Sequence, residues 1–172
     1  MSQPFRSAFG ESETESESAE MLTFQLGSGA FAVNVRQVRE VLDHKPIQPL
    51  ANAPASLLGM IDVRGAGVPV VDLKRKLRMP ESETRPVTGD TRIVVLEFEA
   101  GGETQTIAVI ADAVHEVVDL ADQVVETPPH VGEAWDTTFM QGLGRRNESF
   151  LTLLRADHLF SAGEGVVLER AA

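Results

Sequence analysis

Alternating apolar and polar positions dominate the chain from residue 21 onward. In MLTFQLGSGAFAVNV (21–35), two alternating segments flank a turn that contains Gly27 and Gly29. Side chains two positions apart lie on the same face of a strand. The apolar residues that share a face are Leu22, Phe24 and Leu26 in the first segment, then Phe31, Val33 and Val35 in the second. The pattern predicts a β-hairpin.

The spacing changes within VRQVREVLD (35–43). Apolar residues recur there at intervals of three and four positions, at Val35, Val38, Val41 and Leu42. This spacing is typical of a short amphipathic helix, and Pro46 requires the helix to end before it. A further helical turn is predicted at 56–58, directly before the next strand.

The segment GMIDVRGAGVPVVDL (59–73) contains two runs rich in β-branched residues on either side of an arginine and glycines. Valine and isoleucine favour strands, and Gly65 and Gly67 permit the backbone angles of a tight turn or a bulge. We therefore expect strand, turn and strand, with Arg64 held at the tip and pointing outward. Gly59 is expected to serve the backbone, by allowing a turn or a close approach at the base of the hairpin.

The second half of the chain repeats this style. RIVVLEFEA (92–100) and TQTIAVIADAV (104–114) flank a Gly-Gly turn and predict another hairpin. Further strands are predicted at 115–120, 123–127, 139–144 and 149–155, followed by a short helix at 156–162. A loop rich in turn residues, 78–90, is a candidate boundary between subdomains. Many short strands and only short helices favour an all-β protein, most simply a pair of small antiparallel barrels.

Composition narrows the classes of function. The 172 residues carry a net charge of -11, which argues against nucleic acid as a partner. Apolar runs are too short to span a membrane, so direct membrane insertion is not expected. Residues 1–20 hold five glutamates and five serines, which is typical of a disordered acidic tail and lacks the apolar centre of a secretory signal. We therefore expect a cytoplasmic protein. The absence of cysteine excludes disulfides and thiolate sites.

The search for catalytic or ligand-binding patterns yields little. The four histidines, at 44, 115, 130 and 158, are far apart and show no metal-ligand spacing. Asp62 and Asp72 flank the 60s hairpin and could form a pair of catalytic carboxylates, but no nucleophile or base motif accompanies them, which favours solvated strand ends. We predict no enzymatic activity, no cofactor and no metal, and interpret the chain as a binding module.

Four segments, at 21–42, 47–73, 107–120 and 140–160, follow one another in an order that resembles the CheW-like coupling proteins of bacterial chemotaxis. The resemblance extends from about Leu22 to Phe160. The most specific part is the pattern Gly-x-x-x-x-Arg-Gly-x-x-Val-Pro-x-x-Asp-Leu at 59–73. It is accompanied by the Val38 to Glu40 segment, by ANAP at 51–54, and by the late GLG at 142–144 followed by LTLL at 151–154.

The resemblance implies a mainly β fold of two packed five-stranded SH3-like β-barrel subdomains with short helices, forming a single CheW-like domain over 21–165. It also implies an adaptor without enzymatic activity. Such an adaptor binds the regulatory domain of a CheA-type histidine kinase and the cytoplasmic tip of methyl-accepting chemotaxis receptors, and is thereby recruited to membrane-associated arrays.

The resemblance also points to partner-binding residues. Arg64 matches the arginine of the family's turn, and Val38 and Glu40 match positions that bear on coupling to receptors. Asp62 replaces the usual asparagine and adds a negative charge beside Arg64. An open alternative is that Arg64 and Glu40 pair with each other in the free protein.

Two other functions remain open on the sequence alone. One is a CheW-like scaffold in a pathway that controls an output other than motility. The other is a small hydrolase that uses Asp62 and Asp72.

Overall fold

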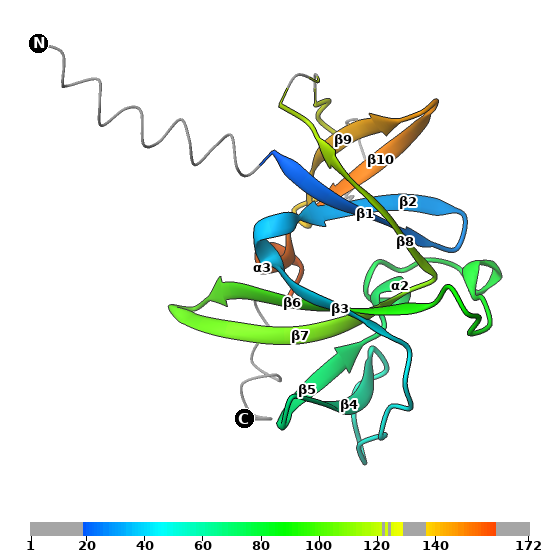
Figure 1. Cartoon of the computed structure of the whole chain (residues 1–172), viewed down its shortest axis with the longest axis vertical. Coiled ribbons are helices and arrows are strands. Elements are labelled where there is room, and N and C mark those ends of the chain that lie inside the picture. The colour runs from blue at the N-terminus through cyan, green and yellow to red at the C-terminus, as the bar shows by residue number, and fades with distance from the viewer. Residues whose placement is uncertain (1–18, 122, 124, 129–136, 161–172) are drawn as a thin grey trace, which may run out of the picture.

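Two five-stranded sheets form the molecule in the computed structural model, which describes residues 19–121, 123, 125–128 and 137–160 (Figure 1). Sheet A has the order β8-β1-β2-β10-β9, and sheet B has the order β3-β6-β7-β5-β4. Within each sheet one neighbouring pair is parallel, β2 with β10 and β5 with β7, and the other pairs are antiparallel.

The strands of sheet A are β1 (Glu20–Leu26), β2 (Gly29–Asn34), β8 (Ala113–Asp119), β9 (Met140–Arg146) and β10 (Ser149–Leu154). Those of sheet B are β3 (Val38–Asp43), β4 (Leu57–Val63), β5 (Ala66–Val71), β6 (Arg92–Ala100) and β7 (Glu103–Ala111). The helical elements are η1 (Val35–Gln37), α2 (Leu73–Lys76), η2 (Glu81–Glu83) and α3 (Ala156–Leu159). The mainly β fold predicted from the sequence is confirmed, as are the hairpins at 20–34, 57–71 and 92–111.

Both sheets curl far enough for side chains of their two edge strands to form an ion pair. β3 and β4 are the two edges of sheet B, yet Glu40 on β3 pairs with Arg64, which directly follows β4. β8 and β9 are the two edges of sheet A, and Glu116 on β8 pairs with Arg146 at the end of β9. Each sheet is therefore closed into a barrel-like half by an arginine and a glutamate.

Strand β6, second from the edge of sheet B, shows how the two halves are joined. One face of β6 packs into a core shared by both sheets, through Val94, Leu96 and Phe98. The other face packs into a second core formed within the sheet B half, through Ile93 and Val95. A strand buried on both faces carries a continuous apolar run rather than an alternating one. Sheet A contributes to the shared core chiefly through its alternating hairpin. The members from sheet A include Leu22, Phe24, Leu26, Val33 and Leu154.

The helix predicted at 35–42 is wrong. Residues 35–37 form a single 3₁₀ turn, and 38–43 form the edge strand β3. Burial along β3 alternates strictly, with Val38, Glu40 and Leu42 turned inward. The glutamate takes an inward position because Arg64 binds it, and a charged residue there hides the two-residue period of the strand.

Two shorter elements and the subdomain boundary also differ from expectation. Instead of a helical turn at 56–58, strand β4 begins at Leu57, where pairing with Val71 extends the hairpin. At 123–127 the described residues form one bridge, Glu126 with Leu143.

The loop 78–90 does not separate the halves, because it joins β5 and β6 of the same sheet. The chain crosses between sheets at η1 and at Asp112 instead. The predicted acidic tail lies outside the described residues except for Ala19 and Glu20.

Candidate functional site

A two-residue turn carries Arg64. Val63 pairs with Ala66, so Arg64 and Gly65 alone form the loop, and both have positive φ, 54° and 86°. Two successive positive φ angles define the type I′ turn, which matches the twist of a hairpin. Glycine adopts this backbone freely, but an arginine does so at a cost of strain. The backbone of this exposed arginine is therefore strained.

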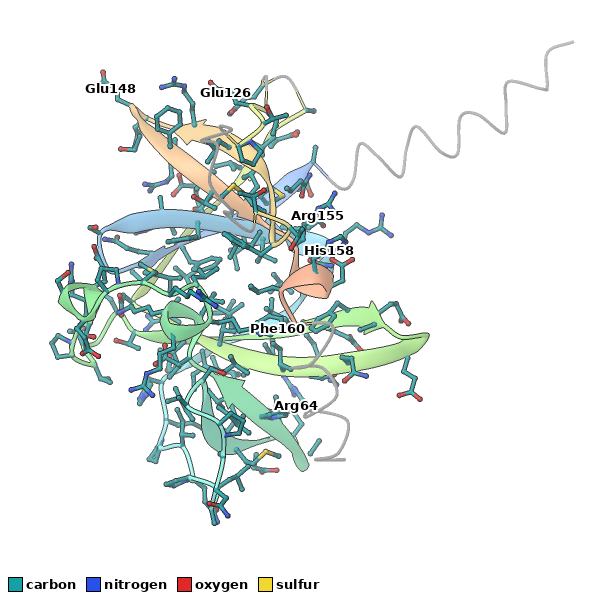
Figure 2. The ribbon with its side chains drawn as sticks, turned by 180° about the vertical axis from the view of Figure 1, so that it is seen from behind. Arg64, Glu126, Glu148, Arg155, His158 and Phe160 are labelled. Carbon is teal, nitrogen blue, oxygen red and sulfur yellow. The ribbon has the colours of Figure 1, made fainter. Side chains whose placement is uncertain are left out.

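A bidentate ion pair holds the Arg64 side chain. Its Nε–H donates to Glu40 Oε2 at 3.2 Å and its Nη2–H to Glu40 Oε1 at 3.0 Å. The side chain of Arg64 is 74% exposed and that of Glu40 only 16%. Hydrogen bonding from Arg64 keeps the pKa of Glu40 below its usual range, so the carboxylate stays charged. Of the alternatives open from the sequence, pairing between these residues is therefore observed in the free chain, and the Arg64 side chain stays largely exposed. Figure 2 shows Arg64 beside the β4–β5 hairpin.

The other two predicted partner-binding residues are placed differently. Val38 is half-buried against the shared core, at a bulge where β3 slips one residue relative to β6. Asp62 is exposed on β4 between buried Ile61 and Val63, and its backbone carbonyl accepts a hydrogen bond from Lys45 Nζ. The structure thus brings Arg64 and Glu40 into contact, leaves Asp62 in solvent on the same hairpin, and turns Val38 inward.

The carboxylate pair considered for hydrolysis does not form a built site. The side chain of Asp72 caps α2 by accepting from the backbone amides of Lys74 and Arg75, and it also forms an ion pair with Arg75. Among the described residues, no group of three or more histidine, aspartate or glutamate side chains could hold a metal ion.

The sequence holds two short basic clusters, KRKLR at 74–78 and Arg145 with Arg146, and both contain residues that form ion pairs. In the KRKLR segment, Lys74 pairs with Asp112 and Arg75 with Asp72. Arg146 pairs with Glu116, while Arg145 lies near Glu126 and over the ring of Phe150. In the described part of the chain no helix is long and apolar enough to cross a bilayer.

The model of the CheW-like domain matches residues 20–164. The chain belongs to the CheW-like domain family. Similar curated proteins include the probable chemotaxis protein CheW of Rhizobium etli, 26% identical over 84% of this chain and 89% of that protein, and the chemotaxis protein CheW of Rhizobium meliloti, 28% identical over the same shares. A crystal structure of the scaffolding protein TtCheW from Thermoanaerobacter tengcongensis aligns with a TM-score of 0.71 and 27% identity, covering 86% of this chain and 90% of that one.

This CheW-like domain contains a second bidentate ion pair between an arginine and a glutamate, which the sequence analysis did not predict. The two pairs, Arg64 with Glu40 and Arg146 with Glu116, are called clamps below. Arg146 Nε–H donates to Glu116 Oε2 at 3.0 Å and its Nη2–H to Oε1 at 3.2 Å. Hydrogen bonding from Arg146 lowers the pKa of Glu116.

An internal repeat provides the signal that could have found the second clamp. VREVLD at 38–43 and VHEVVD at 114–119 share the pattern Val-x-Glu-Val-x-Asp, and each occupies the edge strand that carries its clamp glutamate.

Proposed function

We propose that this chain is a non-enzymatic coupling protein of a chemotaxis signalling array. In this role it binds the regulatory domain of a CheA-type histidine kinase and the cytoplasmic tip of methyl-accepting chemotaxis receptors. Membership of the CheW-like family over residues 20–164 supports the role, as do curated chemotaxis relatives that align over most of their length. Recruitment to membrane-associated arrays would follow from binding the receptors.

The turn that contains Arg64 is the observation that links the proposed binding role to particular residues. Glu40 takes two N–H groups of the guanidinium and orients it, while the side chain remains 74% exposed. The remaining donors of a planar, fixed guanidinium suit a partner carboxylate or carbonyl, and little conformational freedom is lost on binding. Asp62, exposed on the adjacent strand, adds a negative charge that would favour partners with a nearby cation.

The absence of enzymatic activity is part of the same proposal. The one carboxylate pair that the sequence offered is used otherwise, since Asp72 caps α2. A binding role also needs no strong single contact. Individually weak contacts to a kinase and to a receptor become effective when all components are held in one array, because the second binding event is then intramolecular.

Calorimetric titration with the regulatory domain of a CheA-type kinase, and separately with a receptor-tip fragment, tests the proposal. We expect saturable heat with both partners, and at least a tenfold loss of affinity for one of them in Arg64→Glu. Arg78→Glu is the matched control, because Arg78 is also exposed and also has a positive φ, 60°. Binding by neither partner would refute the coupling role. If Arg64→Glu and Arg78→Glu bind both partners with equal affinity, Arg64 is not part of the binding site.

A further inference from the structure

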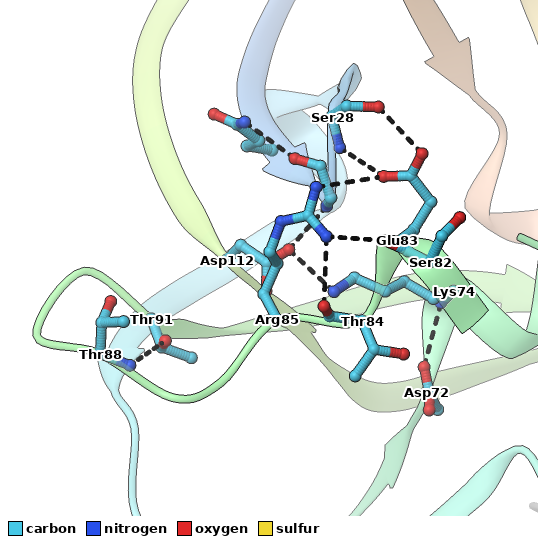
Figure 3. A network of polar contacts seen from close by, with 12 residues as sticks. Ser28, Asp72, Lys74, Ser82, Glu83, Thr84, Arg85, Thr88, Thr91 and Asp112 are labelled. Carbon is cyan, nitrogen blue, oxygen red and sulfur yellow. Dashed lines mark hydrogen bonds and ion pairs between the residues drawn. The ribbon is translucent and has the colours of Figure 1, made fainter. Parts of the chain in front are cut away.

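A contact between the two sheets involves residues 81–85, hereafter the strap. The strap follows α2 of the sheet B half and lies against the β1–β2 turn of sheet A (Figure 3). The Glu83 carboxylate accepts two hydrogen bonds from Ser28, one from the backbone amide at 2.7 Å and one from the hydroxyl at 3.0 Å. Glu83 of the sheet B half thus accepts hydrogen bonds from both the backbone and the side chain of Ser28 in the sheet A half.

A second carboxylate binds the neighbouring amide of the same turn. Asp112 Oδ2 accepts from the Gly27 amide at 2.6 Å and forms an ion pair with Lys74 Nζ at 2.8 Å. The side chains of Asp112 and Lys74 are each only 18% exposed. Hydrogen bonds to a charged acceptor are stronger than neutral ones, and the low exposure limits screening by solvent. Two consecutive amides, of Gly27 and Ser28, are therefore held by two carboxylates that lie outside the hairpin.

The turn is shaped for this close approach. Gly27 has a φ of 59°, and a Cβ placed there would lie 2.2 Å from Glu83 Oε1. Arg85 maintains the shape of the strap, since its Nη1 donates to the carbonyls of Ser82 and Thr84 while its Nη2 approaches Glu83 at 3.5 Å. Lys74 and Arg85 together supply the positive charge that offsets the two carboxylates.

The junction between the two sheets has a different structure on the side opposite the strap. Figure 1 shows α3 on one side of the junction between the sheets, and α2 with the loop that follows it on the other. Near α3 lie two open polar pockets, one beside β6 and β7 and the other beside β9 and β10. Both are lined in part by Arg36, Gln37 and Asp157, and together they are called the groove. The shared core between the two sides contains a small void of about 10 Å³ lined only by apolar side chains. The polar attachment and the open groove thus lie on opposite sides of an apolar contact.

We infer that the strap fixes the angle between the two sheets, with the contacts from Glu83 and Asp112 to the β1–β2 turn as its closing points. The hydrophobic effect is non-directional and does not by itself select one angle between two apolar surfaces, whereas hydrogen bonds to backbone amides define an orientation. Opening the strap releases the halves to rotate about the shared core, and this rotation changes the width of the groove beside α3. The inference concerns the free chain and does not depend on the kinase or the receptor.

Distance measurements between spin labels test this inference. The chain has no cysteine, so Glu103→Cys and Glu148→Cys place two unique labels on exposed residues, one in each half. We expect a single narrow distance distribution in the otherwise unmodified chain and a broadened or shifted one after Glu83→Ala. Glu81→Ala, an exposed position in the same 3₁₀ turn, is the control and should leave the distribution unchanged.

A milder variant and a local probe complete the design. Glu83→Gln preserves the size of the side chain and should broaden the distribution less than Glu83→Ala, so it replaces that variant if circular dichroism shows unfolding. Amide hydrogen exchange at Ser28 reports whether the strap contact has opened. Faster exchange together with a changed distance supports the inference. Faster exchange with an unchanged distance overturns it, because the strap would then be a local contact only.

Discussion

Glu40 and Arg64 join the two edge strands of one five-stranded sheet, although 24 positions separate them in the chain. The carboxylate is largely covered and the guanidinium is largely exposed. The same pair therefore closes the barrel-like half and presents an arginine to the outside. A residue with both roles should show different responses in stability and in binding.

Replacement of Arg64 by asparagine should separate these two responses. Asparagine before glycine is a preferred pair for a type I′ turn, so Arg64→Asn relieves backbone strain while it removes the ion pair. We expect the thermal midpoint to remain within about 2–4 °C of the parent or to rise by that amount, and affinity for the kinase domain or the receptor tip to fall at least tenfold. A larger fall in the midpoint would mean that the ion pair outweighs the strain.

Gly59 should tolerate no side chain. A Cβ at this position would lie 2.1 Å from the carbonyl oxygen of Gln48, and the φ of Gly59 is 149°. Gln48 and Met60 exchange backbone hydrogen bonds across this contact, so neither Gln48 nor β4 can move away without breaking them. Gly59→Ala should lower the free energy of unfolding by about 3 kcal/mol or more, measured by urea titration. Gly101→Ala, where φ is 63° but space is open, should cost only about 1 kcal/mol.

Thr23 is buried and donates its hydroxyl to the carbonyl of Glu116 at 2.6 Å, beside the bulge that offsets β1 from β8. Thr23→Val keeps the shape but leaves this carbonyl without its donor. Urea unfolding should show a loss of about 1–3 kcal/mol. Thr104→Val removes an exposed hydroxyl that donates to Glu99, and should change stability by less than about 0.5 kcal/mol. Equal effects of the two variants would contradict a structural role for the buried hydrogen bond.

Three glutamates should make stability depend on pH in the acid range. Hydrogen bonds lower the folded-state pKa of Glu40, Glu83 and Glu116, from Arg64, Ser28 and Arg146 respectively. In the unfolded chain these partners are lost and each pKa returns to about 4.3. The unfolded state then binds more protons, so the stabilisation is complete above the unfolded-state pKa and disappears as pH falls through the lower folded-state pKa.

The combined Gln variant at positions 40, 83 and 116 tests this expectation. Urea unfolding measured between pH 7 and about pH 3 should show a smaller loss of stability in the variant than in the parent. A control with glutamine at exposed positions 81, 97 and 103 should retain the dependence of the parent. If the parent and the triple variant lose the same stability, other groups govern acid unfolding.

Hairpins were predictable from the sequence because their signals are local. Gly101 and Gly102 mark one turn, and the segment around Arg64 and Gly65 marks another, each between apolar runs. Gly59 was correctly expected to allow a close approach, which is made by the backbone of Gln48.

The failures concern residues whose role depends on distant partners. Glu40 occupies an inward strand position only because Arg64 binds it, and the local pattern therefore suggested a helix. The strap contacts were missed for the same reason, since nothing near Glu83 in the sequence indicates that Ser28, 55 positions earlier, will bind it. The boundary placed at 78–90 followed composition, whereas the real crossings at η1 and Asp112 are too short to differ in composition from the strands beside them.

The division of strands between the sheets has a consequence for synthesis. Sheet B is formed entirely by residues 38–111, whereas sheet A combines β1 and β2 with three strands that follow sheet B in the chain. The β1–β2 hairpin leaves the ribosome before sheet B, but its parallel neighbour β10, where Phe31 aligns with Thr152, emerges after sheet B. Long-range pairings of this kind form slowly. The half that carries Arg64 can thus close during translation, while the other half must keep an apolar hairpin unpaired on one side until β10 has been made.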